Sequence, residues 1–205
     1  MNNSEQDKIT IAGSTSYSLA SKVKDYFQLI KFTLSFMVVF STVVSFLIAP
    51  NEQFYVREKI ISVLLLFVAG MLITGSANAI NQVLEKSSDS LMKRTAQRPV
   101  ASGRMGVTEA GIFAFITGAA GVFMMWNYFN TTSAMVSLFS LFLYGFIYTP
   151  LKKVNSISVL VGAIPGALPC LIGWVAAYGN ETISWTGAWV LFGIQFLWQF
   201  PHFWA

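Results

Sequence analysis

The chain has 205 residues, of which 55% are hydrophobic and only 11% charged, and its formal net charge is +4. A soluble domain carries about a quarter charged residues, so the composition excludes an ordinary soluble enzyme. The cations lie in a few short connections and not on one polar folded face, which excludes a nucleic-acid surface. A single cysteine, Cys170, allows no internal disulfide and indicates no thiolate metal site.

The first 31 residues form a polar arm ahead of the first apolar run. This arm lacks the apolar centre of a signal peptide, and its acids Glu5, Asp7 and Asp25 argue against an acid-poor transit peptide. We expect residues 1–31 to be a cytoplasmic arm and residues 32–205 to be one membrane domain.

Six segments after the arm contain no Asp, Glu, Lys or Arg, and each has 17 to 22 residues. That length crosses a hydrocarbon core of roughly 30 Å as a helix, and lipid offers no partners for the backbone of an isolated strand. None of the segments alternates as a barrel strand does. The sequence therefore predicts an all-α, polytopic transmembrane helical bundle with six spans, Phe32–Pro50, Ile60–Ile80, Ala110–Trp126, Ser133–Pro150, Ile157–Tyr178 and Trp185–Ala205.

The positive charges indicate how this bundle is oriented. Eleven of the thirteen Lys and Arg residues fall in the arm and in the second and fourth connections, whereas the opposite side has only Arg57 and Lys59. The positive-inside rule places the richer side in the cytoplasm. A bacterial plasma membrane is the simplest location.

The fifth apolar segment contains three glycines and two prolines, Gly162, Pro165, Gly166, Pro169 and Gly173. Small residues let membrane helices approach closely, and proline bends a helix. A packing helix and a bent helix beside a cavity are both consistent with this pattern.

The most charged stretch, NQVLEKSSDSLMKRTAQRP, occupies residues 81–99 at the inner end of the second span. Asn81, Glu85 and Asp89 are four residues apart, so they form one stripe if the helix continues through Asp89. Two carboxylates there face the negative end of the helix dipole. Either the local cations or a divalent metal such as Mg²⁺, which prefers oxygen ligands, would compensate for them.

The second half of the stretch favours a site for metal and phosphate over a solvated ion-pair cluster. Lys93, Arg94, Arg98 and Arg104 follow the acids, and guanidinium groups match phosphate oxygens well. Acids for a metal beside cations for phosphate stabilise a departing polyphosphate. Because the site opens onto a membrane interior, we expect the phosphate to carry a lipid tail.

A second motif, YTPLKK, lies at the inner end of the fourth span. It places Tyr148 four residues before Lys152, on the same side of the membrane as the acids. Tyrosine and lysine are also common at membrane interfaces without any catalytic role, so this motif supports the site only in combination with the first.

Together these motifs resemble the UbiA superfamily of intramembrane prenyltransferases. N-x-x-x-E-x-x-x-D is similar to its first Asp-rich motif, N-x-x-x-D-x-x-x-D, and YTPLK to its Y-x-x-x-K motif. The strings DSLMKRTAQRPVASGRM, VGAIPGALPCLIGW and WQFPHFWA resemble more narrowly the branch that farnesylates heme, from about residue 28 to residue 205.

The resemblance implies a fold of nine helices and a second acidic motif after the sixth. The chain ends in LWQFPHFWA, within an apolar run. We therefore expect a C-terminal part of the natural protein to be missing, and we expect the 205 residues alone to be inactive.

The resemblance also implies the reaction and the roles of individual residues. A farnesyl group would pass from farnesyl diphosphate to the ring A vinyl group of heme b, and water would add, giving heme O and diphosphate. The metal ligands for Mg²⁺ would be Asn81, Glu85 and Asp89; the diphosphate-binding cations would be Lys93, Arg94, Arg98 and Lys152; Tyr148 would lie near the allylic carbon. Glu85 stands where the family usually has Asp, one methylene shorter, and we expect its role to survive.

The single histidine, His202, has two interpretations. It is either a hydrogen-bonded interfacial residue or a contact to heme, as iron ligand or as partner of a propionate. Heme enters as a substrate, so Mg²⁺ is the one cofactor we expect, with farnesyl diphosphate, heme b and membrane lipid as the partners.

Two other functions remain open. One is a related prenyltransferase whose acceptor is a quinone precursor, which would share the same diphosphate site. The other is a transport or heme-handling membrane protein without chemistry. Charged residues within spans mark transport paths, and none of the six predicted spans contains one.

Overall fold

The structure is a computed structural model that describes residues 19–50, 56–152, 154, 157–179 and 182–204, with the backbone alone at residues 56 and 202–204. Every regular element in this described part is a helix. The elements are α2 (Leu19–Leu29), α3 (Phe32–Ile48), α4 (Val56–Leu84), α5 (Lys86–Leu91), α6 (Val107–Tyr128), α7 (Thr131–Phe142), the π-helix η1 (Leu143–Tyr148), α8 (Thr149–Leu151), α9 (Ser158–Ala176) and α10 (Trp185–Trp204).

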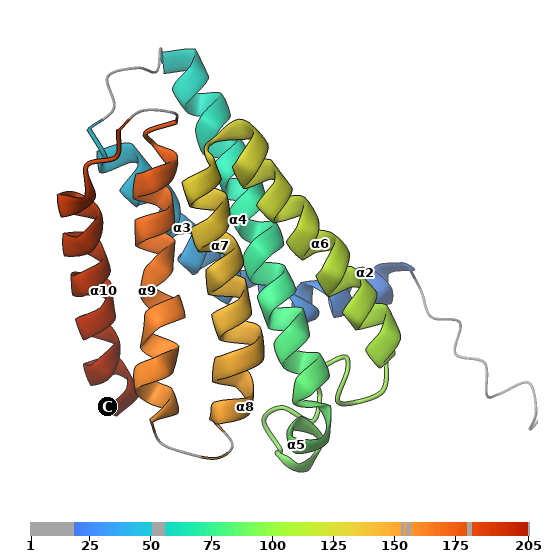
Figure 1. Ribbon diagram of the computed structural model, residues 1–205. Helices are drawn as coiled ribbons and strands as arrows, with labels where there is room; N and C mark the ends of the chain where they lie inside the picture. Colours follow the sequence, from blue (N-terminus) through green and yellow to red (C-terminus); the bar gives the residue numbers. More distant parts are fainter. Residues whose placement is uncertain (1–18, 51–55, 153, 155–156, 180–181, 205) are drawn as a thin grey trace, which may run out of the picture.

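The long helices form a bundle in which α10, α9, α7, α4 and α6 follow one another across the molecule, with α3 behind them (Figure 1). The most extensive packing is between α4 and α6, and α9 packs on both α3 and α10. The short helices α5 and α8 lie at the same end of the bundle (Figure 1). The two sequence motifs are therefore brought to one end, as predicted.

Four helices are long and apolar enough to cross a membrane, Arg57–Leu84, Val107–Tyr128, Thr131–Leu151 and Ser158–Ala176. A fifth candidate is the pair α2 and α3, which meet at a bend of 50°. The predicted all-α membrane bundle is confirmed. The sixth predicted span coincides with α10, and six as the number of spans remains a prediction.

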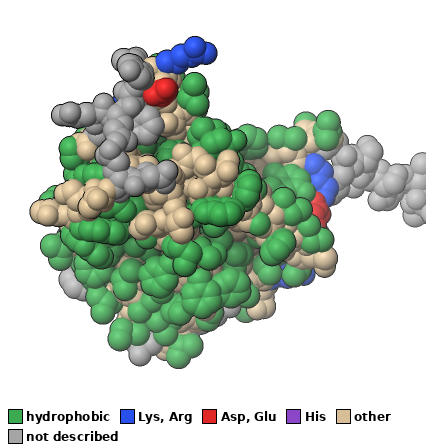
Figure 2. Space-filling view, turned by 45° about the horizontal axis from the view of Figure 1, so that its top comes forward, with side chains coloured by type: hydrophobic (Ala, Val, Ile, Leu, Met, Phe, Trp, Pro, Cys, Tyr) green, Lys and Arg blue, Asp and Glu red, His purple; other side chains and the backbone are tan. Residues whose placement is uncertain are grey.

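The surface agrees with a lipid environment. Figure 2 shows a face covered mainly by hydrophobic side chains, with a few charged groups near its margins. Large apolar side chains such as Phe115, which is 76% exposed, and Leu197, 66% exposed, point outward. A water-soluble monomer rarely exposes so continuous an apolar surface, whereas a bilayer solvates it.

Helix α2 is a feature that the sequence did not suggest, because it forms within the predicted polar arm. Lys22 pairs with Glu109 of α6 at 3.0 Å, and Arg104 pairs with the buried carboxylate of Asp25 at 2.9 Å. These contacts attach part of the arm to the bundle. The chain then turns sharply at Lys31, whose φ of 48° lies in the left-handed region that non-glycine residues rarely adopt.

The core lies around α9, the helix with the glycines and prolines. Val175 and Ala176 are fully buried there, together with Phe46 of α3 and Leu66 of α4. A Cβ atom at Gly173 would collide with the backbone carbonyl of Thr42 in α3. Close packing therefore explains Gly173.

Candidate active site

The three predicted metal ligands are all buried at the inner end of α4 and in α5. Asn81 is 1% exposed, Glu85 4% and Asp89 3%. The helix does not continue through Asp89, the condition for a single stripe, because α4 ends at Leu84. Glu85, with φ of −101° and ψ of 5°, precedes a separate helix, α5. The Ser88 hydroxyl donates to the Glu85 carbonyl, an alternative to the helical ladder that serine favours.

The break nevertheless preserves the four-residue spacing of the motif. The backbone N–H of Glu85 donates to the Asn81 carbonyl at 3.0 Å, and that of Asp89 donates to the Glu85 carbonyl at 2.7 Å. The amide and the two carboxylates therefore stay on consecutive turns.

Two of the predicted phosphate-binding cations pair with these acids. The Lys152 ammonium lies 2.6 Å from Glu85 Oε1, and Arg98 lies 2.7 Å from Asp89 Oδ2 and 4.0 Å from Glu85 Oε2. The Arg98 segment is held in turn by Thr95, whose hydroxyl donates to the Asp89 carbonyl at 2.9 Å. Residues from three separate segments thus meet in one compact cluster of opposite charges.

Lys31 is a third cation of this cluster, and it is not among the diphosphate-binding cations predicted from the sequence. Its ammonium donates to Asn81 Oδ1 at 3.3 Å. Burial, and then the positive charges of Arg98 and Lys152, lower the pKa of Lys31 from 10.5 to about 8, although Glu85 and Asp89 act in the opposite direction. In the sequence Lys31 looks like a membrane anchor, and its position directly before an apolar run was the only available signal.

The Asn81 amide links the acidic motif to the tyrosine-lysine motif. Its nitrogen donates to the Thr149 hydroxyl at 3.3 Å, and that hydroxyl donates to the Tyr144 carbonyl at 2.9 Å. Tyr144 lies in η1, one turn of π-helix that ends at Tyr148. Such turns are rare and often occur at functional sites.

Tyr148 lies between this charged cluster and a partly open chamber of about 510 Å³. The ammonium of Lys152 is 5.7 Å from the centre of the Tyr148 ring. A Cβ atom at Gly162 of α9 would overlap that ring, so the glycine makes room for it. The chamber is lined by residues of α3, α4, α7, η1, α9 and α10.

Most of the chamber wall is apolar, but a few amides line it. Asn78 donates to the Ile30 carbonyl and to the Ser35 hydroxyl, both at 3.1 Å. Its buried Oδ1 has no hydrogen-bond partner among the described residues, so it can accept a hydrogen bond from a bound molecule. Gln199 of α10 also lines the chamber, and donates to the Ala163 carbonyl at 3.0 Å.

The structure does not bring every predicted site residue into the cluster. Lys93 and Arg94 are exposed and form no ion pair with a described residue. Arg104 binds Asp25 and Gln28 instead, which attaches the loop to α2. The side chain of His202, the predicted heme contact, lies outside the described residues.

The donor set is compatible with Mg²⁺. Asn81, Glu85 and Asp89 offer amide and carboxylate oxygens, and Mg²⁺ commonly uses one or two carboxylates with waters and substrate phosphates. Asp89 Oδ1 has no ion-pair or hydrogen-bond partner among the described residues. Among the described residues, no three His, Cys, Asp or Glu side chains lie close enough together to hold a metal ion. A Mg²⁺ ion bound by Glu85 and Asp89 would therefore also need the Asn81 amide oxygen, waters or substrate phosphates as ligands.

Comparison with known proteins relates this arrangement to prenyl transfer. The pattern of the UbiA prenyltransferase family matches residues 38–205. The chain is 44% identical over 194 residues to a protein named protoheme IX farnesyltransferase from Flavobacterium johnsoniae, which covers 95% of this chain and 63% of that protein. The chain thus spans about three fifths of the length of the curated relatives that it matches.

Solved structures of low sequence identity have the same fold. A digeranylgeranylglyceryl phosphate synthase superposes with a TM-score of 0.73 at 20% identity, covering 87% of this chain and 60% of that one. A UbiA homologue from Archaeoglobus fulgidus, bound to GPP and Mg²⁺, superposes with a TM-score of 0.69 at 15% identity, covering 87% of this chain and 62% of that one.

Proposed function

Because the chain belongs to the UbiA prenyltransferase family, we propose that it provides the diphosphate site of an enzyme that farnesylates heme b. In this reaction the C1–O bond of farnesyl diphosphate breaks, and the oxygen leaves with the electron pair. The ring A vinyl group attacks C1, water adds to the resulting cation with loss of a proton, and the products are heme O and diphosphate.

The observation that carries this proposal is the cluster in which Glu85 and Asp89 face Lys31, Arg98 and Lys152. The relative from Flavobacterium johnsoniae bears the name of the same activity, and the homologue from Archaeoglobus fulgidus holds GPP and Mg²⁺. An exposed ion-pair cluster would need no chamber behind it, whereas a prenyl diphosphate needs both a charged pocket and an apolar one.

The cations of the cluster would change partners when diphosphate binds. In the structure Lys152 and Arg98 neutralise the carboxylates. Mg²⁺, when bound, would take over that role and neutralise charge on the leaving phosphates. Lys31, Arg98 and Lys152 would then be able to donate to phosphate oxygens, which stabilises the charge that develops as the C1–O bond breaks.

Tyr148 and the chamber would position the farnesyl group and protect its allylic cation. The farnesyl chain would lie in the chamber, with Tyr148 beside the allylic carbon. The mostly apolar wall would limit capture of the cation by stray water. Lys93 and Arg94 would approach the bound diphosphate from the exposed loop, and His202 would contact heme.

The first test measures Mg²⁺-dependent release of diphosphate by the natural full-length protein in detergent or nanodiscs. Asp89→Ala should abolish it, because it removes a buried carboxylate of the cluster. Glu58→Ala is the matched control, since Glu58 is an exposed acid near the other end of α4, and it should leave release unchanged. Normal turnover in Asp89→Ala would refute the metal assignment.

The second test identifies the acceptor. The same protein is supplied with farnesyl diphosphate and either heme b or 4-hydroxybenzoate, and the products are separated by mass. Heme O is the expected product. Prenylated 4-hydroxybenzoate without heme O would keep the diphosphate site and overturn the acceptor, whereas no product and no diphosphate release would favour a non-catalytic membrane protein.

A further inference from the structure

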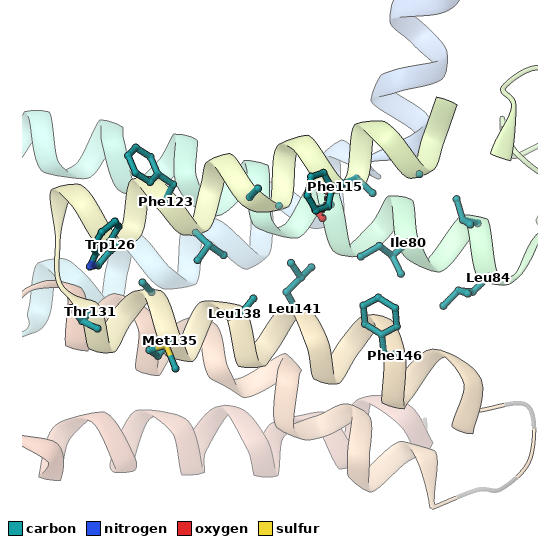
Figure 3. A pocket seen from close by; sticks show the side chains of 18 residues that line it. Ile80, Leu84, Phe115, Phe123, Trp126, Thr131, Met135, Leu138, Leu141 and Phe146 are labelled. Carbon is teal, nitrogen blue, oxygen red and sulfur yellow. Dashed lines mark hydrogen bonds between the residues drawn. The ribbon is translucent and has the colours of Figure 1, made fainter. Parts of the chain in front are cut away.

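A second cavity lies on another side of the bundle. It is a groove of about 770 Å³ between α6 and α7, with α4 as its floor. Phe115, Phe123 and Trp126 of α6 line the groove on one side, and Met135, Leu138 and Phe146 of the facing helix line it on the other (Figure 3). It lies within the two ranges, Val107–Tyr128 and Thr131–Leu151, that can cross a membrane.

The groove offers nothing for a polar ligand along its length. None of the described residues that line it is charged. The hydroxyl of Ser76, one of its few polar groups, already donates to the Ala114 carbonyl at 2.7 Å. Because the groove opens at membrane depth, its occupant is expected to be a hydrocarbon chain.

One end of the groove continues into a polar pocket of about 270 Å³, because Val83 and Leu84 line both. The other residues of this pocket are Lys86, Ser87, Ser90 and Ala101. Lys86 is exposed, is the first residue of α5, and forms no ion pair with a described residue. An apolar groove thus ends at a cation and two hydroxyl-bearing residues at the level where lipid headgroups lie.

We propose that this groove and its mouth form a binding site for an anionic glycerophospholipid. One acyl chain lies in the groove between α6 and α7, and the phosphate lies at the mouth, near Lys86, Ser87 and Ser90. Attraction between a lysine and an anionic headgroup selects this class of lipid over zwitterionic ones.

This site is distinct from the chamber of the proposed enzyme. Ile80, which lines the groove, and Asn78, which lines the chamber, are two residues apart and therefore lie on nearly opposite sides of α4. Leu141 is the one described residue that lines both cavities. The proposal rests on the membrane-spanning helices and not on prenyl transfer, so either can fail alone.

The test counts the lipids that the natural full-length protein retains. Protein is reconstituted with phosphatidylglycerol or phosphatidylcholine, extracted gently and measured by native mass spectrometry. Phosphatidylglycerol should be retained in preference. Lys86→Gln should weaken its retention about fivefold, as expected for one surface lysine, whereas Lys24→Gln, which also removes an exposed lysine, should not.

A glycine pair provides the test of the groove itself. Gly111 lines the groove, and Gly193 lies on α10; a Cβ atom at either meets no other atom within 4 Å. Gly111→Leu should therefore fill the groove without distorting the bundle and remove the retained lipid. Gly193→Leu is the matched control and should retain it.

Three results would overturn the proposal. The first is equal retention of the two lipids by the unchanged protein. The second is undiminished phosphatidylglycerol retention in both Lys86→Gln and Gly111→Leu. The third is loss of a dimer in Gly111→Leu without loss of lipid, which would show that a second copy of the chain covers the groove.

Discussion

At the scale of single residues, the charged cluster consists of two buried carboxylates and partly exposed cations, and these groups depend on one another. Glu85 is 4% exposed, and its direct partner is Lys152. A buried carboxylate without a counter-ion is costly, whereas removal of both members of a buried pair can be nearly neutral. The contribution of each member therefore depends on whether the other is present.

We expect Lys152→Met to destabilise the ligand-free protein by about 1–2 kcal/mol, less than for a fully buried pair because Lys152 is one third exposed. The double variant Glu85→Gln/Lys152→Met should recover part of that loss. The apparent melting temperatures in detergent of both variants measure this, with Lys24→Met as a neutral control. The single variant Glu85→Gln completes the comparison. If the losses of stability in Glu85→Gln and in Lys152→Met add up to the loss in the double variant, the two groups do not interact.

A second prediction concerns Lys31. Lys31→Met should weaken binding of Mg²⁺-pyrophosphate about tenfold or more, because a charge-assisted hydrogen bond contributes about 1.5–3 kcal/mol. Isothermal titration calorimetry measures the affinity. Lys24→Met should bind normally, and an unchanged affinity in Lys31→Met would remove Lys31 from the site.

Some residues of this site could be predicted from the sequence, and others could not. The spacing of Asn81, Glu85 and Asp89 was visible because all three lie in one short stretch. Lys31 was not visible, because it lies 50 positions before Asn81 and only the bend between α2 and α3 brings it there. Contacts of that kind depend on tertiary structure.

At the scale of elements, the packing of α9 on α3 depends on a glycine. Gly173→Ala should push the helices apart and cost about 1–3 kcal/mol, as overpacking does. Gly193→Ala, on the same kind of helix but in open space, should be neutral or slightly stabilising. Melting temperatures in detergent compare the two, and equal values would contradict the packing role of Gly173.

The boundaries of the elements were harder to predict than their existence. The apolar runs indicated the long helices because length and hydropathy alone identify a span. The break at Glu85 and the π-turn of η1 left no comparable pattern, since each depends on a few local hydrogen bonds, such as that from Thr149 to Tyr144. Both irregularities lie next to the proposed site.

At the scale of the whole molecule, the distribution of cations predicts an orientation in the membrane, with the side that is rich in Lys and Arg in the cytoplasm. We expect a membrane-impermeant thiol reagent to label Asn127→Cys in intact cells, because Asn127 is exposed at the side poor in cations. Lys93→Cys should react only after the cells are opened. The natural Cys170 is buried and gives little background. The reverse pattern of labelling would invert the topology.

The hydrogen bonds of the Asn81 amide restrict which side chains can replace it at residue 81. An ammonium group can only donate hydrogen bonds, so the amide oxygen must face Lys31 and the amide nitrogen must face Thr149. The three hydrogen bonds therefore run in one direction: Lys31 donates to Asn81, Asn81 donates to Thr149, and Thr149 donates to the Tyr144 carbonyl of η1. An aspartate at residue 81 would be a good metal ligand, but it could not donate to the Thr149 hydroxyl, whose own proton is donated to the Tyr144 carbonyl. The direction of these hydrogen bonds explains why the motif N-x-x-x-E-x-x-x-D begins with an amide and not with a third acid.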